Sequence, residues 1–343
     1  MKIIYRLLFF LFFIPVVSFG QETAKALPDE GVNAFLLRNN RSVKNYYQPF
    51  IELNKGKFGK NYSLLKGVTY VLPPLDQTTS STSNPIESAS DIKKGKRTEP
   101  LFGKKYAEYS VESDRLKGAC FYLVSGHGGP DPGAVGNVDG TNLHEDEYAY
   151  DVMLRLARLL LMEGATVHII IQDAKDGIRD ERFLNGTQRE TCMGDPIPLN
   201  QTKRLQQRCD KINALDQKAK EKYRRAFFIH LDSRSKKERI DVFFYHWANS
   251  NDGKKTANTL RTTFQDYYKK HQPSRGFKGT VSSRELFVLK NTNPVAVLTE
   301  LGNIKNDLDL RRFLEVSNRQ ILANWICQGF IRDYEDFQKN NGK

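Results

Sequence analysis

The chain has 343 residues, enough for about two domains of average size. Charged residues make up 27% of it and hydrophobic residues 39%, which excludes a collagen-like, a fully disordered or a multi-span membrane chain. The formal net charge of +13 is high, but no RNP motif, zinc-finger spacing or basic heptad segment accompanies it. The charge therefore indicates an acidic partner and gives no indication of nucleic acid.

The first twenty residues have the pattern of a secretory signal peptide. Lys2 and Arg6 precede an apolar run at residues 7–17, and small residues frame a cleavage site before Gln21. A membrane anchor is the alternative, but the run is shorter than the roughly 20 residues that span a bilayer. We expect residues 1–20 to be removed, leaving no membrane span, and the protein to be secreted across the inner membrane into the periplasm, the cell wall or the extracellular space.

Four cysteines enter this oxidising compartment: Cys120, Cys192, Cys209 and Cys327. An even number permits two disulfides in three connectivities, and Cys192 and Cys209 flank one polar segment. Buried free thiols are the alternative, and the sequence leaves both open.

A Ser/Thr-rich stretch at residues 75–100 separates a small front region from a large back domain. It contains the run DQTTSSTSNPIESASDIKKGKRTEP, which has no hydrophobic periodicity and therefore predicts a linker. The region before it, 31–74, has short apolar clusters, turn signals and a final strand before two prolines, which predict a compact module.

The second half of this module, residues 50–73, resembles the end of a LysM module. The resemblance rests on a leucine–asparagine step, a Leu-x-Gly turn and a last strand ending in Leu-Pro: Leu53-Asn54, Leu65-Lys66-Gly67 and Val71-Leu72-Pro73. It implies binding to a glycan that contains N-acetylglucosamine. A small domain without this function is the alternative.

The back domain, residues 116–338, alternates strand and helix signals. Short Val/Ile/Phe-rich runs predict strands at 119–124, 166–171, 226–231, 241–245, 285–289 and 295–299. Apolar residues at helical spacing predict a helix between the first two strands, which Gly164 ends, and others at 202–218, 254–271 and 308–337. Together they predict an α/β three-layer domain, with a six-stranded mixed, mostly parallel sheet flanked by helices.

Four polar residues stand at strand ends or at a helix start, where α/β sheets bind their ligands. They are His127, Glu145, His230 and Glu300. Two histidines and one carboxylate form the three-ligand set of a catalytic zinc, which keeps a fourth position for water. Glu300 could deprotonate that water and pass the proton to the leaving group, so the set predicts Zn²⁺-dependent amide hydrolysis. His144, beside Glu145, is an alternative ligand.

The order of these residues resembles the zinc-dependent N-acetylmuramoyl-L-alanine amidases of the type 3 amidase family over nearly all of the back domain. The matching motifs are GHGGPDPGAVG at 126–136, Leu143-His144-Glu145-Asp146-Glu147, Ile229-His230, and Glu300-Leu301-Gly302 with Asn306. The resemblance implies that His127, Glu145 and His230 hold zinc and that Glu300 is the general base and then acid. It also implies peptidoglycan as the substrate, cut between N-acetylmuramic acid and L-alanine.

One departure from the family concerns Val124. Family members usually carry an acidic residue at this position, two residues before the first histidine. Zinc should therefore bind more weakly here, or another group must orient His127.

Two other functions remain open, namely a zinc peptidase acting on stem peptides and a non-catalytic peptidoglycan-binding protein or amidase activator. The irregular segment 174–199 is longer than such a connection needs to be. We expect it to cover the cleft until an activator protein displaces it. The protein is expected to be a monomer.

Overall fold

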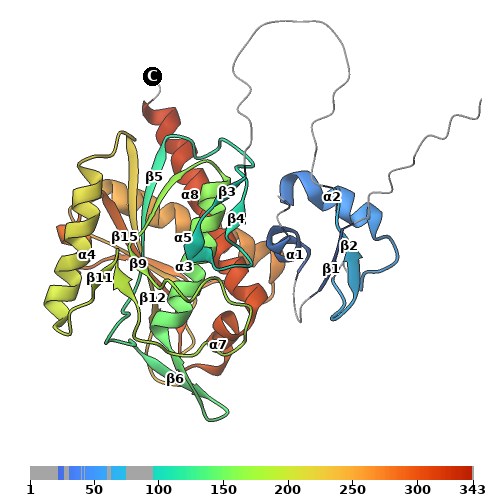
Figure 1. Ribbon diagram of the computed structural model, residues 1–343, viewed down its shortest axis with the longest axis horizontal. Helices are drawn as coiled ribbons and strands as arrows, with labels where there is room; N and C mark the ends of the chain where they lie inside the picture. Colours follow the sequence, from blue (N-terminus) through green and yellow to red (C-terminus); the bar gives the residue numbers. More distant parts are fainter. Residues whose placement is uncertain are drawn as a thin grey trace, which may run out of the picture.

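The computed structural model describes residues 22–26, 31–39, 41, 43–59, 63–74 and 96–341. The predicted signal peptide and most of the predicted linker lie outside the described residues. Figure 1 shows a small N-terminal module beside a larger α/β domain. Within the described ranges, no helix is both long and apolar enough to cross a membrane.

The larger domain is built on a six-stranded sheet in the order β14-β13-β15-β12-β5-β8. In chain order the strands are β5 (Ala119–Ser125), β8 (Thr166–Ile169), β12 (Tyr223–Asp232), β13 (Phe243–His246), β14 (Thr280–Ser283) and β15 (Val295–Asn303). The strands β8, β5, β12 and β15 run parallel, whereas β13 pairs antiparallel with β15 and parallel with β14. The predicted mixed, mostly parallel sheet is confirmed.

Alternate residues of β5 show why the sheet has a layer on each face. The odd-numbered residues 119–123 pack with α3 (Glu145–Met162), α5 (Asn251–His271) and α8 (Val316–Asn341). The even-numbered residues 120–124 pack with α4 (Gln201–Asp216) and α6 (Phe287–Asn291). Because the side chains of a strand alternate between faces, an unbroken apolar run fills two cores at once. The three-layer prediction is confirmed (Figure 1).

Two predicted elements are wrong. The strand predicted at 285–289 does not form: the sixth strand is β14, and the apolar residues after it make the short helix α6, which packs against α4. A short apolar run fits a buried helical turn as well as a strand, so its pattern alone cannot decide. The helix predicted at 308–337 is two helices, α7 (Asp307–Leu314) and α8, separated by the extended residue Glu315.

The path from β5 to α3 runs through a hairpin, β6 (Val135–Val138) and β7 (Thr141–His144). Its two turn residues, Asp139 and Gly140, both have positive φ, as the favoured two-residue hairpin turns require. The second strand leads straight into Glu145, the first residue of α3. The hairpin thus fixes where this carboxylate enters the domain.

Residues 173–200 form the long connection between the sheet and α4. The strand β10 (Thr191–Cys192) pairs with β9 (Ile171–Gln172) on one side and with β11 (Asp195–Pro196) on the other, in a small antiparallel sheet. The part before β10 has no regular structure, as predicted.

The N-terminal module pairs β1 (Thr23–Lys25) with β2 (Thr69–Val71) and places α1 (Val32–Arg38) and α2 (Val43–Leu53) between them in the chain. Its core includes Phe35, Phe50 and Tyr70, none of which is exposed. The first strand lies before the predicted start at residue 31, and α1 contacts α8. In the chain, the N-terminal module is followed by β3 (Arg97–Thr98), the 3₁₀ turn η2 (Pro100–Phe102) and β4 (Glu108–Tyr109), and then by the first strand of the large sheet.

All four cysteines are buried free thiols. Three of them, Cys120, Cys192 and Cys209, pack in the apolar cluster between the sheet and α4. They therefore behave as small hydrophobic residues of the core.

A buried ion network joins α3, α8 and the long connection. The Asp151 carboxylate accepts hydrogen bonds from Nε of Arg155 (2.8 Å) and from Nε of Arg319 (2.6 Å). It also accepts one from the backbone N–H of Arg179 (2.8 Å). Both guanidinium groups donate to the carbonyl oxygen of Arg179 as well. Because these side chains are almost fully buried, each charge depends on its partners.

We predict that Asp151→Asn lowers the free energy of unfolding by about 3–5 kcal/mol, because two buried guanidinium groups lose their carboxylate. Burial opposes the charge of Asp151, but Arg155 and Arg319 outweigh it and lower its pKa to about 2. The stabilisation is therefore complete above the unfolded pKa of about 3.9 and is lost as the pH falls through about 2.

Urea unfolding between pH 7 and pH 2 measures this effect. The exposed Asp252 pairs with Lys255, and Asp252→Asn should change the free energy of unfolding by about 0.5 kcal/mol or less. Equal stability of the two variants at pH 7 would contradict the prediction.

Candidate active site

Three neighbouring parallel strands end at one edge of the sheet. Ser125 lies opposite Ile229, and His230 lies opposite Glu300 in the pairing of β12 with β5 and with β15. His127 follows Ser125 by two residues on a glycine-rich turn. The structure therefore brings the predicted His127, His230 and Glu300 to the same edge.

Glu145 joins the two histidines in one group. Its Oε1 lies 3.3 Å from Nε2 of His127 and 3.0 Å from Nδ1 of His230. The imidazole rings are 5.1 Å apart between centroids and nearly perpendicular. The candidate ligand atoms of the three residues all lie within 4.8 Å of one another. Two imidazole nitrogens and a carboxylate oxygen are a donor set that suits zinc.

Two glycines leave the space that this group occupies. Gly126 lies so close to the ring of His230 that a Cβ there would overlap it. A Cβ on Gly133 would come within 2.7 Å of Glu145 Oε2 and of His127 Cδ2. The glycines of the GHGGPDPG motif are therefore needed for close packing around the three donors, and His127 itself has a φ of +57°.

The Glu145 carboxylate is held in its charged form. It is 4% exposed and accepts hydrogen bonds from the backbone N–H groups of Ala134 (2.9 Å) and Leu231 (3.0 Å). Burial opposes its charge, but the hydrogen bonds from His127 and His230 outweigh burial and hold its pKa well below the usual range. A buried carboxylate that stays charged is suited to bind a cation.

The two histidines differ in their surroundings. Burial opposes protonation of His127, but its hydrogen bonds to Asp131 and Glu145 raise its pKa to about 10. Burial instead lowers the pKa of His230.

Asp131 is the orienting group for His127. Its Oδ2 lies 2.9 Å from Nδ1 of His127 and accepts a hydrogen bond from Nη2 of Arg204 in α4 (2.6 Å). Val124 is fully buried in the core, so it contributes nothing to the site. The orienting group that the sequence left unidentified lies within the motif itself, four residues after the histidine. Nη2 of Arg208, also in α4, donates to the carbonyl oxygen of His127.

Glu300 presents an oxygen that is ready to accept a proton. Its Oε2 is buried and has no hydrogen-bond partner in the described part of the chain. Burial, and then the nearby carboxylates of Glu145 and Asp232, raise its pKa well above the usual range. A carboxylate of this kind, beside residues that could hold a metal ion, has the properties of a general base.

The other histidines near the sheet lie outside this group. His144 precedes α3, and its ring packs against Gly186, so the structure does not bring this alternative ligand into the group of His127, Glu145 and His230. His246 is 5% exposed, and its Nδ1 lies 2.8 Å from the carbonyl oxygen of Trp247. His168 stacks on Tyr122.

Comparisons with known proteins find similarity to amidases. Residues 122–332, more than half of the chain, match the N-acetylmuramoyl-L-alanine amidase family. The probable cell wall amidase LytH of Staphylococcus aureus is 27% identical over 225 residues, which cover 65% of this chain and 61% of that protein. The match thus spans less than two thirds of that relative.

Solved amidase structures give further similarities. The CwlD amidase from Clostridioides difficile, in complex with the GerS lipoprotein, is 20% identical with a TM-score of 0.48, covering 63% of this chain and 98% of CwlD. Ami1 from Mycobacterium smegmatis is 17% identical with a TM-score of 0.48, covering 64% of this chain and 99% of Ami1. On the family match, this chain belongs to the N-acetylmuramoyl-L-alanine amidase family.

Proposed function

We propose that this protein is an exported zinc-dependent peptidoglycan amidase. It cleaves the amide between the lactyl group of N-acetylmuramic acid and the L-alanine of the stem peptide. The observation that carries this proposal is the convergence of His127, Glu145 and His230 beside Glu300. Membership of the amidase family supports it.

In this proposal His127, Glu145 and His230 hold the zinc ion. A bound zinc ion would lower the pKa of water from about 15.7 to about 7 and polarise the amide carbonyl. Asp131 orients His127 by its hydrogen bond, and Arg204 holds Asp131 in place. These contacts fix the direction of Nε2 of His127, the nitrogen that would bind zinc, before any ion binds.

In this proposal Glu300 transfers a proton from the attacking water to the L-alanine nitrogen. Its free Oε2 takes a proton from the attacking water as the new carbon–oxygen bond forms. Glu300 then gives this proton to the L-alanine nitrogen as the carbon–nitrogen bond breaks. The products are the lactyl carboxylate and a stem peptide with a free amino terminus.

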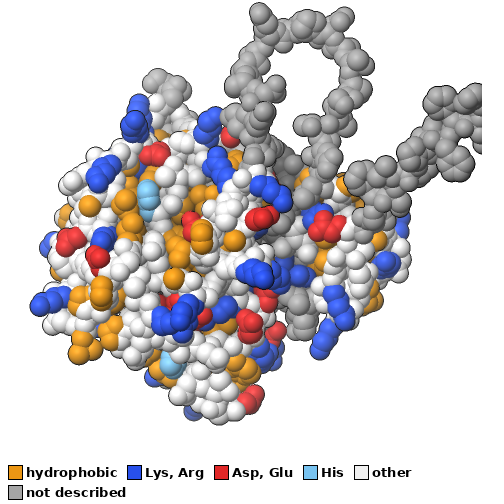
Figure 2. Space-filling model, in the orientation of Figure 1, with side chains coloured by type: hydrophobic (Ala, Val, Ile, Leu, Met, Phe, Trp, Pro, Cys, Tyr) orange, Lys and Arg blue, Asp and Glu red, His pale blue; other side chains and the backbone are white. Residues whose placement is uncertain are grey.

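The N-terminal module supplies the proposed attachment to the wall. A groove beside α2, lined by Ile51, Lys55 and Phe58 among others, is where we place the glycan. Lys and Arg side chains are spread over the face shown in Figure 2, among acidic ones. Such a surface suits an anionic wall polymer without forming one concentrated patch. The LytH relative, a cell wall amidase, supports action in the wall after export.

An activator remains part of the proposal, with its site on residues 174–199. Ile197 in this segment packs against Gly129 in the turn that follows His127. Residues 179–181 are held by Arg155 and Arg319. We therefore place any displacement at the end of the segment, residues 193–199, where Ile197 adjoins the His127 turn.

We predict that the mature zinc-loaded protein releases stem peptides with an intact L-alanine amino terminus from purified peptidoglycan. Glu300→Gln removes the proton acceptor and should lower the rate by roughly 10²–10⁴-fold. Mass spectrometry identifies the released peptides and measures the rate of their release by the unaltered protein and by the variant. Glu108→Gln, which alters an exposed carboxylate paired with Lys96, is the matched control and should keep full activity.

Other products would contradict the amidase. Shortened stem peptides would indicate a zinc peptidase. A lack of products, with sacculus binding retained in both the unaltered protein and the Glu300→Gln variant, would indicate a non-catalytic binding protein.

We also predict that Asp131→Asn lowers zinc affinity by about 10–100-fold, because His127 loses the charged partner that orients it. Competition with a chromophoric chelator measures the affinity, and circular dichroism checks the fold. Asp195→Asn, an exposed change that removes only the pair with Lys211, is the control. An unchanged affinity in the Asp131 variant would show that this hydrogen bond does not support the metal centre.

A further inference from the structure

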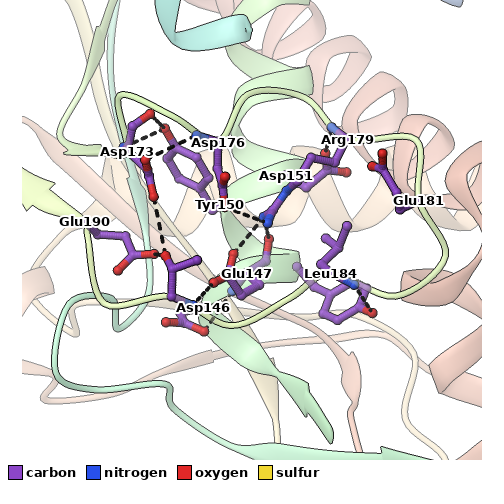
Figure 3. Close-up of polar contacts among 12 residues, drawn as sticks. Asp146, Glu147, Tyr150, Asp151, Asp173, Asp176, Arg179, Glu181, Leu184 and Glu190 are labelled. Atoms are coloured by element: carbon purple, nitrogen blue, oxygen red, sulfur yellow. Dashed lines mark hydrogen bonds and ion pairs between the residues drawn. The ribbon is translucent and has the colours of Figure 1, made fainter. Parts of the chain in front are cut away.

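A second group, made of three acidic residues, lies next to the candidate active site. It consists of Asp146 and Glu147 in the first turn of α3 and Glu190 in the long connection. The candidate ligand oxygens of the three carboxylates lie within 4.8 Å of one another. The residues are 3%, 2% and 7% exposed, respectively. Figure 3 shows them where the connection passes over the start of α3.

One oxygen of this group has no partner. Oδ1 of Asp146 accepts the backbone N–H of Glu147 (2.9 Å), but Oδ2 is buried without a hydrogen bond from any described residue. A buried carboxylate oxygen without a partner is unfavourable, because it has lost its hydrogen bonds to water. This oxygen therefore indicates a missing donor or cation.

The other two carboxylates are held in fixed positions. Glu190 accepts hydrogen bonds from the backbone N–H of Gly129 and from Oγ1 of Thr187, both at 2.8 Å. Glu147 accepts from the backbone N–H of Thr187 (2.6 Å) and from Nη2 of Arg179 (2.8 Å). Backbone N–H groups together with the Arg179 and Thr187 side chains thus fix the Glu147 and Glu190 carboxylates close to Asp146.

The charges of this group do not balance. Arg179 compensates one of the three carboxylates and also pairs with Asp176. Arg189 pairs with Asp173 and Asp176 and is thus engaged by other carboxylates. The positive end of α3 supplies roughly half a charge. No ion pair joins Asp146 or Glu190 to a described Lys or Arg, and a divalent cation between the three carboxylates would supply positive charge there.

We propose that Asp146, Glu147 and Glu190 form a second cation site, separate from the His127 group, that binds Ca²⁺ or Mg²⁺. All three ligands are carboxylates, and oxygen donors select hard cations. Ca²⁺ binds oxygen at about 2.4 Å, so one ion can reach donors that lie up to about 4.8 Å apart. The hydroxyl of Thr187, beside Glu190, offers a further neutral oxygen.

An ion in this position would join three segments. Asp146 directly follows Glu145 of the candidate active site, and Glu190 binds the backbone of Gly129, two residues after His127. The ion would therefore fix the connection to the start of α3 and to the turn that carries His127. It acts as a structural cation that stabilises the active-site edge.

Terbium luminescence tests the proposal on the mature zinc-loaded protein. Tb³⁺ occupies calcium sites and emits when a nearby tyrosine is excited, and the hydroxyl of Tyr150 is hydrogen-bonded to the backbone of Asp173 beside the group. We expect sensitised emission that Ca²⁺ or Mg²⁺ competes away. Elemental analysis after dialysis against each cation should give one zinc and one added ion per chain. The cation that is retained identifies the occupant.

Two substitutions make the test specific. Glu190→Gln should weaken Tb³⁺ binding at least about tenfold, whereas Glu181→Gln, an exposed change in the same connection, should leave it unaltered. Asp146→Asn should also weaken binding, which covers the case in which the Glu190 variant does not fold. Zinc as the sole retained metal, or equal Tb³⁺ binding in all variants, would overturn the proposal. Because metal content is measured without substrate, this result is independent of the amidase assay.

Discussion

The parallel pairing of β5, β12 and β15 is the constraint on which the candidate site depends. It sets Ser125 opposite Ile229 and His230 opposite Glu300. The polar residues at the ends of the three strands therefore lie at one edge of the sheet. The sheet is buried on both faces, and its strands cannot shift register without exposing apolar side chains. The positions of His230 and Glu300 are therefore fixed by strands of the core, and the turn that carries His127 begins directly after a third such strand.

The first turn of α3 serves two purposes through three successive acidic residues. Glu145 points to the histidines, whereas Asp146 and Glu147 group with Glu190. One and a half turns further along the same helix, Asp151 binds Arg155 and Arg319. Helix α3 is thus the element through which the long connection, α8 and the candidate metal centre are joined.

The sequence predicts the four central residues because each stands in a local pattern. His230 and Glu300 end apolar strands, His127 lies in a glycine-rich turn after one, and Glu145 begins a long helix. Their supporting contacts leave no such pattern. Arg204 reaches Asp131 across 73 positions, and Glu190 reaches Gly129 across 61. Only the fold reveals these pairs, just as only packing against α4 shows that residues 287–291 form a helix.

The position of the orienting carboxylate explains how this chain can carry Val124 and still direct His127. An acidic residue at 124 would lie on β5, where the even-numbered side chains fill the core with α4. Asp131 instead approaches from the turn, and its place depends on Arg204 of α4, while Arg208 of the same helix binds the carbonyl oxygen of His127. In this chain the strand position is an apolar core contact, and α4 supports the orienting carboxylate. The strength of metal binding should therefore depend on α4, on the opposite face of the sheet from α3, which supplies Glu145.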